Sequence, residues 1–207
     1  LTNHGAQPTQ SQTCNIAFVK THKTASTTMA TILYRYAKRH DFVIANFTDH
    51  HTTIPLEEAV EQVTKSGRRV DLMHYHYAWN GYYKGTWAEA EESYAQIMTD
   101  PSRINFVTVL REPVSHFLSY YYYFIQPSNG LSIAEYIELH RGLENTHILY
   151  NPLSAEFGIR TIDELGMFIR DSLPHFKMVL LTEFFDESLA LFMRMFNWDP
   201  IDMTYCR

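Results

Sequence analysis

Apolar and polar positions along the chain alternate between two periods, one typical of a strand and one of a helix. A short apolar run at Asn15–Lys20 is bounded by polar residues and predicts a buried strand. After it, apolar residues recur at helical spacing, which predicts a helix from Ser26 to about Arg39. Its apolar stripe comprises Met29, Ile32, Leu33 and Tyr36. A strand, a polar loop and a helix make the first half of a βα unit.

The same alternation continues to the end of the chain. Strands are predicted at Arg69–His74, Ile104–Leu110 and Lys177–Leu181, and helices at Leu56–Lys65, Trp87–Met98, Ser132–Arg141, Thr161–Ser172 and Glu183–Phe196. A helix also follows Leu110, with Pro113 in its first turn and a core stripe of Val114, Phe117, Leu118 and Tyr121. This order predicts a parallel α/β sheet flanked by helices, with its ligand at the carboxyl ends of the strands.

Length and composition predict one domain of ordinary globular type. The chain has 207 residues, of which 45% are hydrophobic and 19% charged. We expect residues 1–13 to form a disordered leader and residues 14–207 to form a single domain. The net charge of −6 argues against a broad nucleic-acid-binding face, so no nucleic-acid partner is expected. No run approaches the ~18 apolar residues of a membrane span, so we expect the chain itself to be soluble.

The loop after the first predicted strand has the composition of an anion site. A strand-to-helix turn offers unpaired backbone N–H groups and the positive end of a helix dipole. Lys20 and Lys23 supply charge there, and small or hydroxylated residues follow at Thr24, Ala25, Ser26 and Thr27. The alternative is an ordinary helix cap with two solvated lysines. Both glycines of a Walker A loop are missing, which argues against ATP hydrolysis.

A second candidate anion site follows the strand that ends at Leu110. Arg111 leaves the carboxyl end of that strand, and Ser119 lies on the helix after it. An arginine and a serine hydroxyl that converge suit a phosphate. The alternative is an arginine paired with Glu112 or Asp100, beside a solvent-facing serine. Two anion sites on neighbouring strands indicate one ligand with two separated phosphate groups.

These two loops resemble those of Golgi carbohydrate sulfotransferases. The run Lys20–Thr28 is similar to their 5′-phosphosulfate loop, and Arg111 with Ser119 is similar to their 3′-phosphate motif. The Lys-Thr-His-Lys-Thr-Ala-Ser run and the tail Leu181–Leu189 look most like galactose 3-O-sulfotransferases. The aromatic residues of Tyr120–Phe124 also resemble heparan sulfate 2-O-sulfotransferases. The resemblance extends over about residues 15–200 and is weak at 41–68 and 126–175.

The resemblance implies a P-loop-like α/β fold that binds PAPS (3′-phosphoadenosine 5′-phosphosulfate), releases PAP and uses no metal. It places Lys23 at the bridging oxygen of the leaving phosphate. It assigns the phosphosulfate cradle to Lys20, Lys23, Thr24, Ala25, Ser26 and Thr27, and the 3′-phosphate clamp to Arg111 and Ser119. It also implies that the full-length protein lies in the Golgi lumen on a membrane anchor absent from this chain, and we expect the chain to be truncated at its C-terminus.

The acceptor hydroxyl must lose its proton, and histidine is the usual base near neutral pH. His74 and His76 follow a predicted strand, face the same side and resemble the catalytic pair of uronyl 2-O-sulfotransferases. We favour His76 as the base and His74 as its helper, with His22, beside Lys23, as the rival. A His-x-His pair also occurs in metal sites, but no third ligand stands at a recognisable spacing, so no metal is expected. Whether Cys14 and Cys206 form a disulfide is left open.

The sequence therefore predicts a sulfotransferase that moves a sulfuryl group from PAPS to a carbohydrate hydroxyl. By resemblance, the acceptor is the 3-OH of a galactose in a glycan or glycolipid, and the net negative charge favours a neutral glycan over a polyanion. Three alternatives remain at this stage. They are a uronyl 2-O-sulfotransferase-like enzyme acting on a polysaccharide, a P-loop kinase-like enzyme using ATP, and a non-catalytic nucleotide-binding domain.

Overall fold

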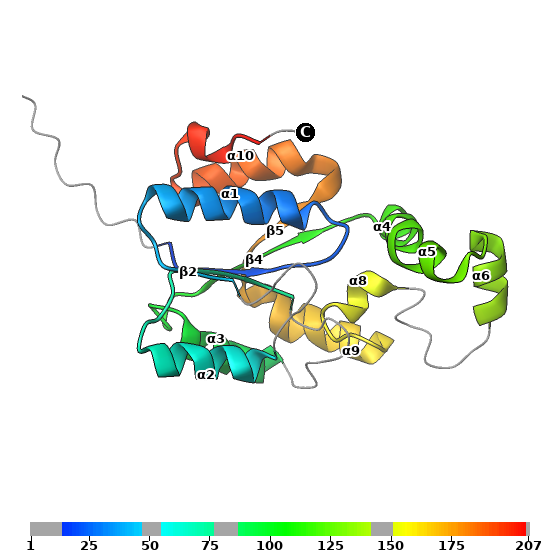
Figure 1. Cartoon of the computed structure of the whole chain (residues 1–207), viewed down its shortest axis with the longest axis horizontal. Coiled ribbons are helices and arrows are strands. Elements are labelled where there is room, and N and C mark those ends of the chain that lie inside the picture. Colours follow the sequence, from blue (N-terminus) through cyan, green and yellow to red (C-terminus); the bar gives the residue numbers. More distant parts are fainter. Residues whose placement is uncertain (1–13, 47–54, 77–86, 142–150, 206–207) are drawn as a thin grey trace, which may run out of the picture.

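The computed structural model describes residues 14–46, 55–76, 87–141 and 151–205. Its five strands form one parallel sheet in the order β2-β3-β1-β4-β5. The strands are β1 (Ile16–Val19), β2 (Ile44–Asn46), β3 (Leu72–Tyr75), β4 (Asn105–Leu110) and β5 (Phe176–Leu181). Helices cover both faces of the sheet (Figure 1). The expected parallel α/β sheet is confirmed.

The helices divide between the two faces. Helices α1 (Ser26–Arg39) and α10 (Phe185–Phe196) cover one face, and α2 (Leu56–Ser66), α3 (Trp87–Ile97) and α9 (Ile162–Met167) cover the other (Figure 1). The π-helical segment η3 (Phe168–Ser172) continues α9. Single turns of 3₁₀ helix form η4 (Leu173–His175), η5 (Thr182–Phe184) and η6 (Pro200–Met203). The helices predicted from apolar periodicity therefore exist close to their predicted bounds.

Alternation along β1 explains how one strand serves two cores. Ile16 and Phe18 are fully buried against α1 and α10, while Ala17 and Val19 are buried on the opposite face. Successive side chains of a strand point to opposite faces, so a strand covered on both sides is apolar at every position. The predicted helical stripe is also confirmed, because its four residues in α1 belong to the same core as Ile16.

An arm of short helices extends from the carboxyl end of β4, beyond the edge of the sheet (Figure 1). It comprises residues 113–140, with α4 (Pro113–Tyr120), the π-helical turn η2 (Tyr121–Ile125), α5 (Gln126–Asn129) and α6 (Ile133–His140). The predicted core stripe of α4 is wrong at Val114 and Leu118, which are 64% and 38% exposed. Tyr121 is buried as predicted, and His116, which was not part of the predicted stripe, is buried as well. The reason is that α4 leaves the sheet and packs on the short helix α8 (Pro152–Ala155).

Three short elements differ from the sequence-based expectation. The strand expected at Arg69–His74 is β3, which begins and ends later, and neither β2 nor α8 was predicted. Strand β2 has 3 residues and α8 has 4, which is too short for either period to be recognised. Strand β2 owes its structure to its neighbour, since it pairs with β3 along its whole length.

Several expectations fall outside the part of the chain that the structure describes. They concern the leader at residues 1–13 and the pairing of Cys206. Cys14 itself is buried directly before β1, and burial raises the pKa of its thiol. Within the described ranges, no helix is both long and apolar enough to cross a membrane.

Candidate active site

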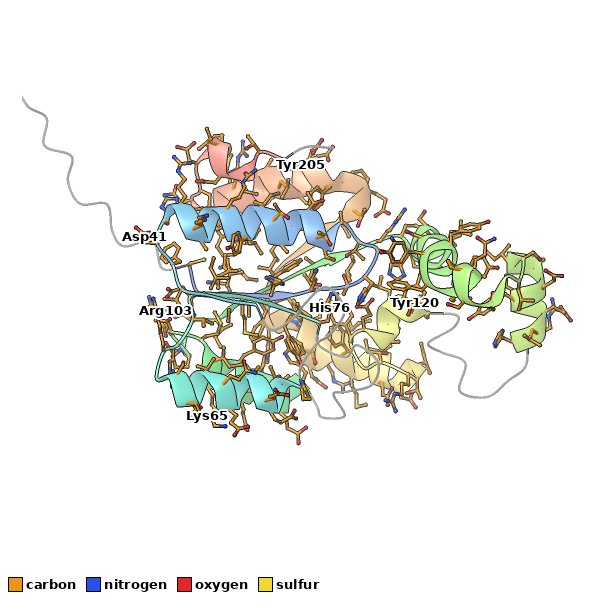
Figure 2. The ribbon with its side chains drawn as sticks, viewed as in Figure 1. Asp41, Lys65, His76, Arg103, Tyr120 and Tyr205 are labelled. Atoms are coloured by element: carbon orange, nitrogen blue, oxygen red, sulfur yellow. The ribbon has the colours of Figure 1, made fainter. Side chains whose placement is uncertain are left out.

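The candidate site lies at the carboxyl edge of the sheet. Parallel strands all end at one edge, so the segments after β1, β3 and β4 meet there. In Figure 2, His76 and Tyr120 lie at this edge, whereas Asp41 and Arg103 lie at the opposite end of the sheet. The segment Lys20–Ala25, which joins β1 to α1, is the centre of the site and is called the β1 loop below.

The backbone of the β1 loop has the form of an anion cradle. Lys23 and Ala25 have positive φ angles of 59° and 61°, in the left-handed region that non-glycine residues seldom adopt. Alternating backbone handedness turns successive N–H groups toward one point, which makes a concave anion site. The N-terminus of α1 begins at Ser26, and no side chain caps it. Its first N–H groups therefore add to the cradle.

Hydroxyl groups hold the β1 loop in this form. Thr24 and Ser26 both donate hydrogen bonds to the carbonyl of Thr21, the first at 3.1 Å. The Thr21 hydroxyl donates to the Val109 carbonyl on β4 at 2.7 Å. The sequence analysis counted Thr24, Ser26 and Thr27 among the hydroxylated residues of the candidate anion site. In the structure the hydroxyls of Thr24 and Ser26 point inward, which leaves the backbone N–H groups for an anion.

Two lysines bring positive charge to the cradle, and both lose part of their contact with water. Burial lowers the pKa of Lys20, and the nearby carboxylate of Glu156 partly offsets this effect. Burial also lowers the pKa of Lys23, and the guanidinium of Arg111 adds to the shift. The Lys23 ammonium lies 3.7 Å from the centre of the Tyr123 ring. A bound anion would relieve the mutual repulsion of Lys23 and Arg111, so these charges suit a phosphate-bearing ligand.

Arg111 joins the two predicted anion sites. Its Nη1 donates to the Lys23 carbonyl at 3.0 Å, and its buried Nε has no hydrogen-bond partner among the described residues. The alternative pairing with Glu112 is wrong, because that carboxylate caps α4 by accepting from Val114 and Ser115. An orphaned guanidinium N–H beside a cradle fits a second phosphate group.

Ser119 has a less direct relation to Arg111. It lies in the last turn of α4 and is half-buried. No contact between Ser119 and Arg111 is found in the described part of the molecule. The structure therefore places Arg111 in the candidate site but shows, among the residues it describes, no contact that would place Ser119 there.

His74 and His76 have different surroundings although they are two positions apart. His74 lies within β3, between Phe18 of β1 and Asn46 of β2. Burial, followed by the charges of Lys20 and His76, lowers the pKa of His74 to about 4. Its Nδ1 has no hydrogen-bond partner among the residues described. A histidine with so low a pKa is a weak proton acceptor near pH 7.

His22 and His76 form a stacked pair. Their ring centroids are 3.9 Å apart and their planes differ by 21°. The Nδ1–H of His22 donates to the Glu156 carboxylate at 2.9 Å, and the Nδ1 of His76 lies 3.6 Å from the same oxygen. Burial lowers the pKa of His76, and Glu156 opposes that shift. The structure thus unites the predicted base with its rival around one carboxylate.

Three residues that contact the loop were missed by the sequence analysis. Glu156, just after α8, contacts both His22 and His76. The Nε2–H of His116 donates to the His22 carbonyl at 2.8 Å. The Thr182 hydroxyl lies within donating distance of the carbonyls of Thr24 and Leu110. No local spacing marks Glu156, which follows a short unpredicted helix. No third metal ligand could be recognised in the sequence, but Glu156 lies where one could stand. Possible ligand atoms of His22, His76 and Glu156 lie within 4.8 Å of one another.

Comparison with known proteins gives consistent matches. A family model described as galactose-3-O-sulfotransferase matches residues 3–207. Galactose-3-O-sulfotransferase 3 of Mus musculus is 28% identical, over 97% of this chain and 48% of its own length. Galactosylceramide sulfotransferase of Mus musculus is also 28% identical, over 97% and 48%. Galactose-3-O-sulfotransferase 2 of Mus musculus is 27% identical, over 92% and 51%. The chain spans about half the length of the curated relatives it matches.

Proposed function

This chain belongs to the galactose-3-O-sulfotransferase family, and from that premise we propose that it transfers a sulfuryl group from PAPS to a hydroxyl of a galactose-containing glycan or glycolipid. The observation that carries the proposal is the β1 loop, whose left-handed Lys23 and Ala25 shape an uncapped cradle with Arg111 attached to it. Such a cradle beside a second orphaned cation suits a ligand with two separated phosphate groups.

The donor would be held by this chain's cations and backbone donors. PAPS would supply the sulfuryl group, and PAP would leave through its 5′-phosphate. The N–H groups of Thr24 to Thr27, with Lys20 and Lys23, hold the phosphosulfate. Arg111 holds the 3′-phosphate, with Ser119 as its proposed partner. Lys23 offsets the negative charge that develops on the leaving phosphate, which lowers the barrier to transfer. No metal ion takes part in this proposal.

A histidine at the edge of the sheet takes the proton of the acceptor hydroxyl. His22 and His76 are the candidates, because both lie beside the cradle and contact the same carboxylate. His74 is the proposed helper of His76 in its neutral form, since its pKa of about 4 keeps it uncharged near pH 7. Its neutral ring beside Lys20 keeps a further charge out of the site.

The acceptor follows from the relatives. Two of the matching proteins are named galactose-3-O-sulfotransferases and one is named for galactosylceramide. We therefore propose a galactose 3-OH as the acceptor, in a glycan or a glycolipid. The same likeness leads us to propose the Golgi lumen as the compartment, and residues 14–207 as one sulfotransferase domain.

Calorimetric titration with PAP tests the donor site, with AMP and ATP as competing ligands. We expect PAP to bind more tightly than either, and Arg111→Ala to weaken PAP binding about 10- to 100-fold, because it removes a charge-assisted contact. Arg103→Ala is the matched control, since this exposed arginine lies at the opposite end of the sheet (Figure 2). Equal binding of ATP, or PAP binding that is indifferent to Arg111, would contradict the proposal.

A further inference from the structure

One buried carboxylate at the site has no part in the proposed reaction so far. Glu156 is 4% exposed and follows α8, far along the chain from the β1 loop. Burial alone would raise its pKa, but the hydrogen bond from His22 and the electrostatic interactions with His22 and His76 outweigh burial, so the pKa is lowered. The side chain is therefore a carboxylate, and burying a charge is costly unless partners compensate for it.

The contacts of Glu156 fix His22 at two points. The backbone N–H of His22 donates to Oε1 at 2.8 Å, and its ring Nδ1 lies 3.0 Å from Oε1 and 2.9 Å from Oε2. His116 holds the carbonyl of the same residue at 2.8 Å. Because a carboxylate only accepts, it places the ring proton of His22 on Nδ1. The lone pair is then on Nε2, which is the arrangement of a general base oriented by a carboxylate.

His76 completes this arrangement from the other side. Its ring stacks on His22, and its Nδ1 lies 3.6 Å from Oε2 of Glu156. A positive charge on either ring is stabilised by the carboxylate, whereas charges on both would repel. Lys20 from the β1 loop and His116 and Tyr120 from α4 also interact electrostatically with the Glu156 carboxylate, and Arg111 acts on His116. The carboxylate thus favours the charged forms of Lys20 and His116 and keeps Tyr120 neutral.

We propose that Glu156 is the positioning residue of the proton-accepting histidine: it fixes the ring and tautomer of His22 and stabilises the imidazolium formed during transfer. This inference rests on the proposed function. In the step, the acceptor oxygen bonds to sulfur as the bond from sulfur to the leaving phosphate breaks. The acceptor proton passes to Nε2 of His22, while the Nδ1 proton stays in its bond to Glu156. Solvent takes the proton from Nε2 before the next turnover.

The same three residues could be read as ligands of a metal ion, but the ring geometry disfavours that reading. The lone pair of an imidazole nitrogen lies in the plane of its ring, and a metal ion binds along it. The two rings are stacked with nearly parallel planes 21° apart. An ion in the plane of one ring would lie out of the plane of the other. A shared carboxylate on stacked rings therefore suits proton transfer better than metal binding.

The decisive variant is Glu156→Gln, which keeps the size of the side chain and removes its charge. Glu92→Gln, on the exposed face of α3, is the matched control. We expect kcat to fall about 10²-fold or more in E156Q, with KM for PAPS and PAP affinity within about threefold of wild type. The acid limb of the kcat–pH profile should move to lower pH, because the negative charge that favours a neighbouring imidazolium is removed.

Ring ¹⁵N NMR reads the tautomer without any turnover. The signals of His22 are assigned by their loss in His22→Ala, and we expect Nδ1 to carry the proton in wild type and to lose that preference in E156Q. Glu156→Asp keeps the charge on a shorter side chain. It should give an intermediate kcat, and it carries the test if E156Q fails to fold.

Three outcomes separate the possibilities. An unchanged His22 spectrum and an unchanged kcat–pH profile in E156Q would overturn the inference. Loss of activity on treatment with EDTA, restored by Zn²⁺ or Mn²⁺, would also overturn it by making the three residues metal ligands. Absence of PAP binding and transfer in wild type would instead remove the proposed function, and the ¹⁵N spectra would still decide whether Glu156 sets the tautomer.

Discussion

The β1 loop and the arm meet at the same edge of the sheet but are built in opposite ways. In the loop, Thr21 and Thr24 are fully buried, and its backbone carbonyls accept hydrogen bonds from Arg111 directly after β4, from His116 on α4 and from Thr182 in η5. The arm carries large apolar side chains in solvent, at Val114, Leu118, Tyr122, Tyr123, Ile137 and Leu139. The β1 loop and the arm contact each other at two places. Lys23 lies over the Tyr123 ring, and His116 donates to the His22 carbonyl.

The contrast shows that this edge of the sheet combines a loop of fixed geometry, the β1 loop, with an adaptable surface, the arm. A cradle for phosphates must be preorganised, because small displacements of its N–H groups reduce the stabilisation of developing charge. Hydrogen bonds from three directions give the β1 loop that rigidity. The arm has few long-range contacts and is expected to open locally at lower free energy. A surface of this kind suits contacts that vary between ligands.

The largest expected effect tests the fixed side of the contrast. Lys23→Ala should lower kcat about 10²- to 10³-fold, because the ammonium that offsets charge on the leaving phosphate is lost. Lys38→Ala, an exposed lysine in the last turn of α1, is the control. Initial-rate measurements at saturating PAPS give the comparison. A near-wild-type rate in K23A would show that the loop positions the donor without contributing charge to the transition state.

The next effect concerns the strand beneath the loop. The pKa of His74 falls from 6.5 in an unfolded reference to about 4 in the fold. As pH falls, His74 therefore binds a proton in the unfolded state before it does so in the folded state. The free energy of unfolding is unaffected by this residue above pH 6.5 and decreases between pH 6.5 and pH 4. By pH 5 the loss is about 2 kcal/mol. Urea unfolding of wild type and His74→Gln at pH 7.5 and 5 measures it, and equal pH dependence in the two proteins would contradict the assignment.

The smallest effect tests the adaptable side. Ser132 caps α6 in a capping box with Glu135. Ser132→Ala should cost about 1 kcal/mol, felt mainly within the arm. Hydrogen exchange should become faster in α6 while β1 and β4 keep their protection and PAP affinity stays unchanged. If exchange accelerates across the sheet as well, the arm and the β1 loop unfold as one unit and the contrast does not hold.

Much of the fold and the position of the β1 loop could be predicted because their causes are local. The spacing of apolar residues changes from that of a strand to that of a helix around Lys20–Ser26. This change predicts both the turn and its place at the end of a strand. The burial of Ile16 and Phe18 on one face and Ala17 and Val19 on the other explains why β1 is apolar throughout. Such features depend on sequence neighbours, which apolar patterning records.

The rest could not be predicted because its causes are contacts between distant segments. Apolar spacing predicted a buried Val114, but α4 leaves the sheet and that side chain meets solvent. The inward turn of the Thr24 hydroxyl depends on the Thr21 carbonyl in a loop whose left-handed residues are not glycines. Glu156 reaches the site through the packing of α8 on α4. None of these contacts leaves a period in the sequence.

The contact between His22 and Glu156 also links the site to the order in which the chain folds. The two residues are 134 positions apart, so closing this contact carries a substantial loop-closure entropy. The β1–α1 unit can form from neighbouring residues, whereas the histidine acquires its partner only after the segment at α8 has docked. A heated molecule is thus expected to lose the contact at Glu156 before the strands of the sheet separate, so heat inactivation should precede loss of the sheet.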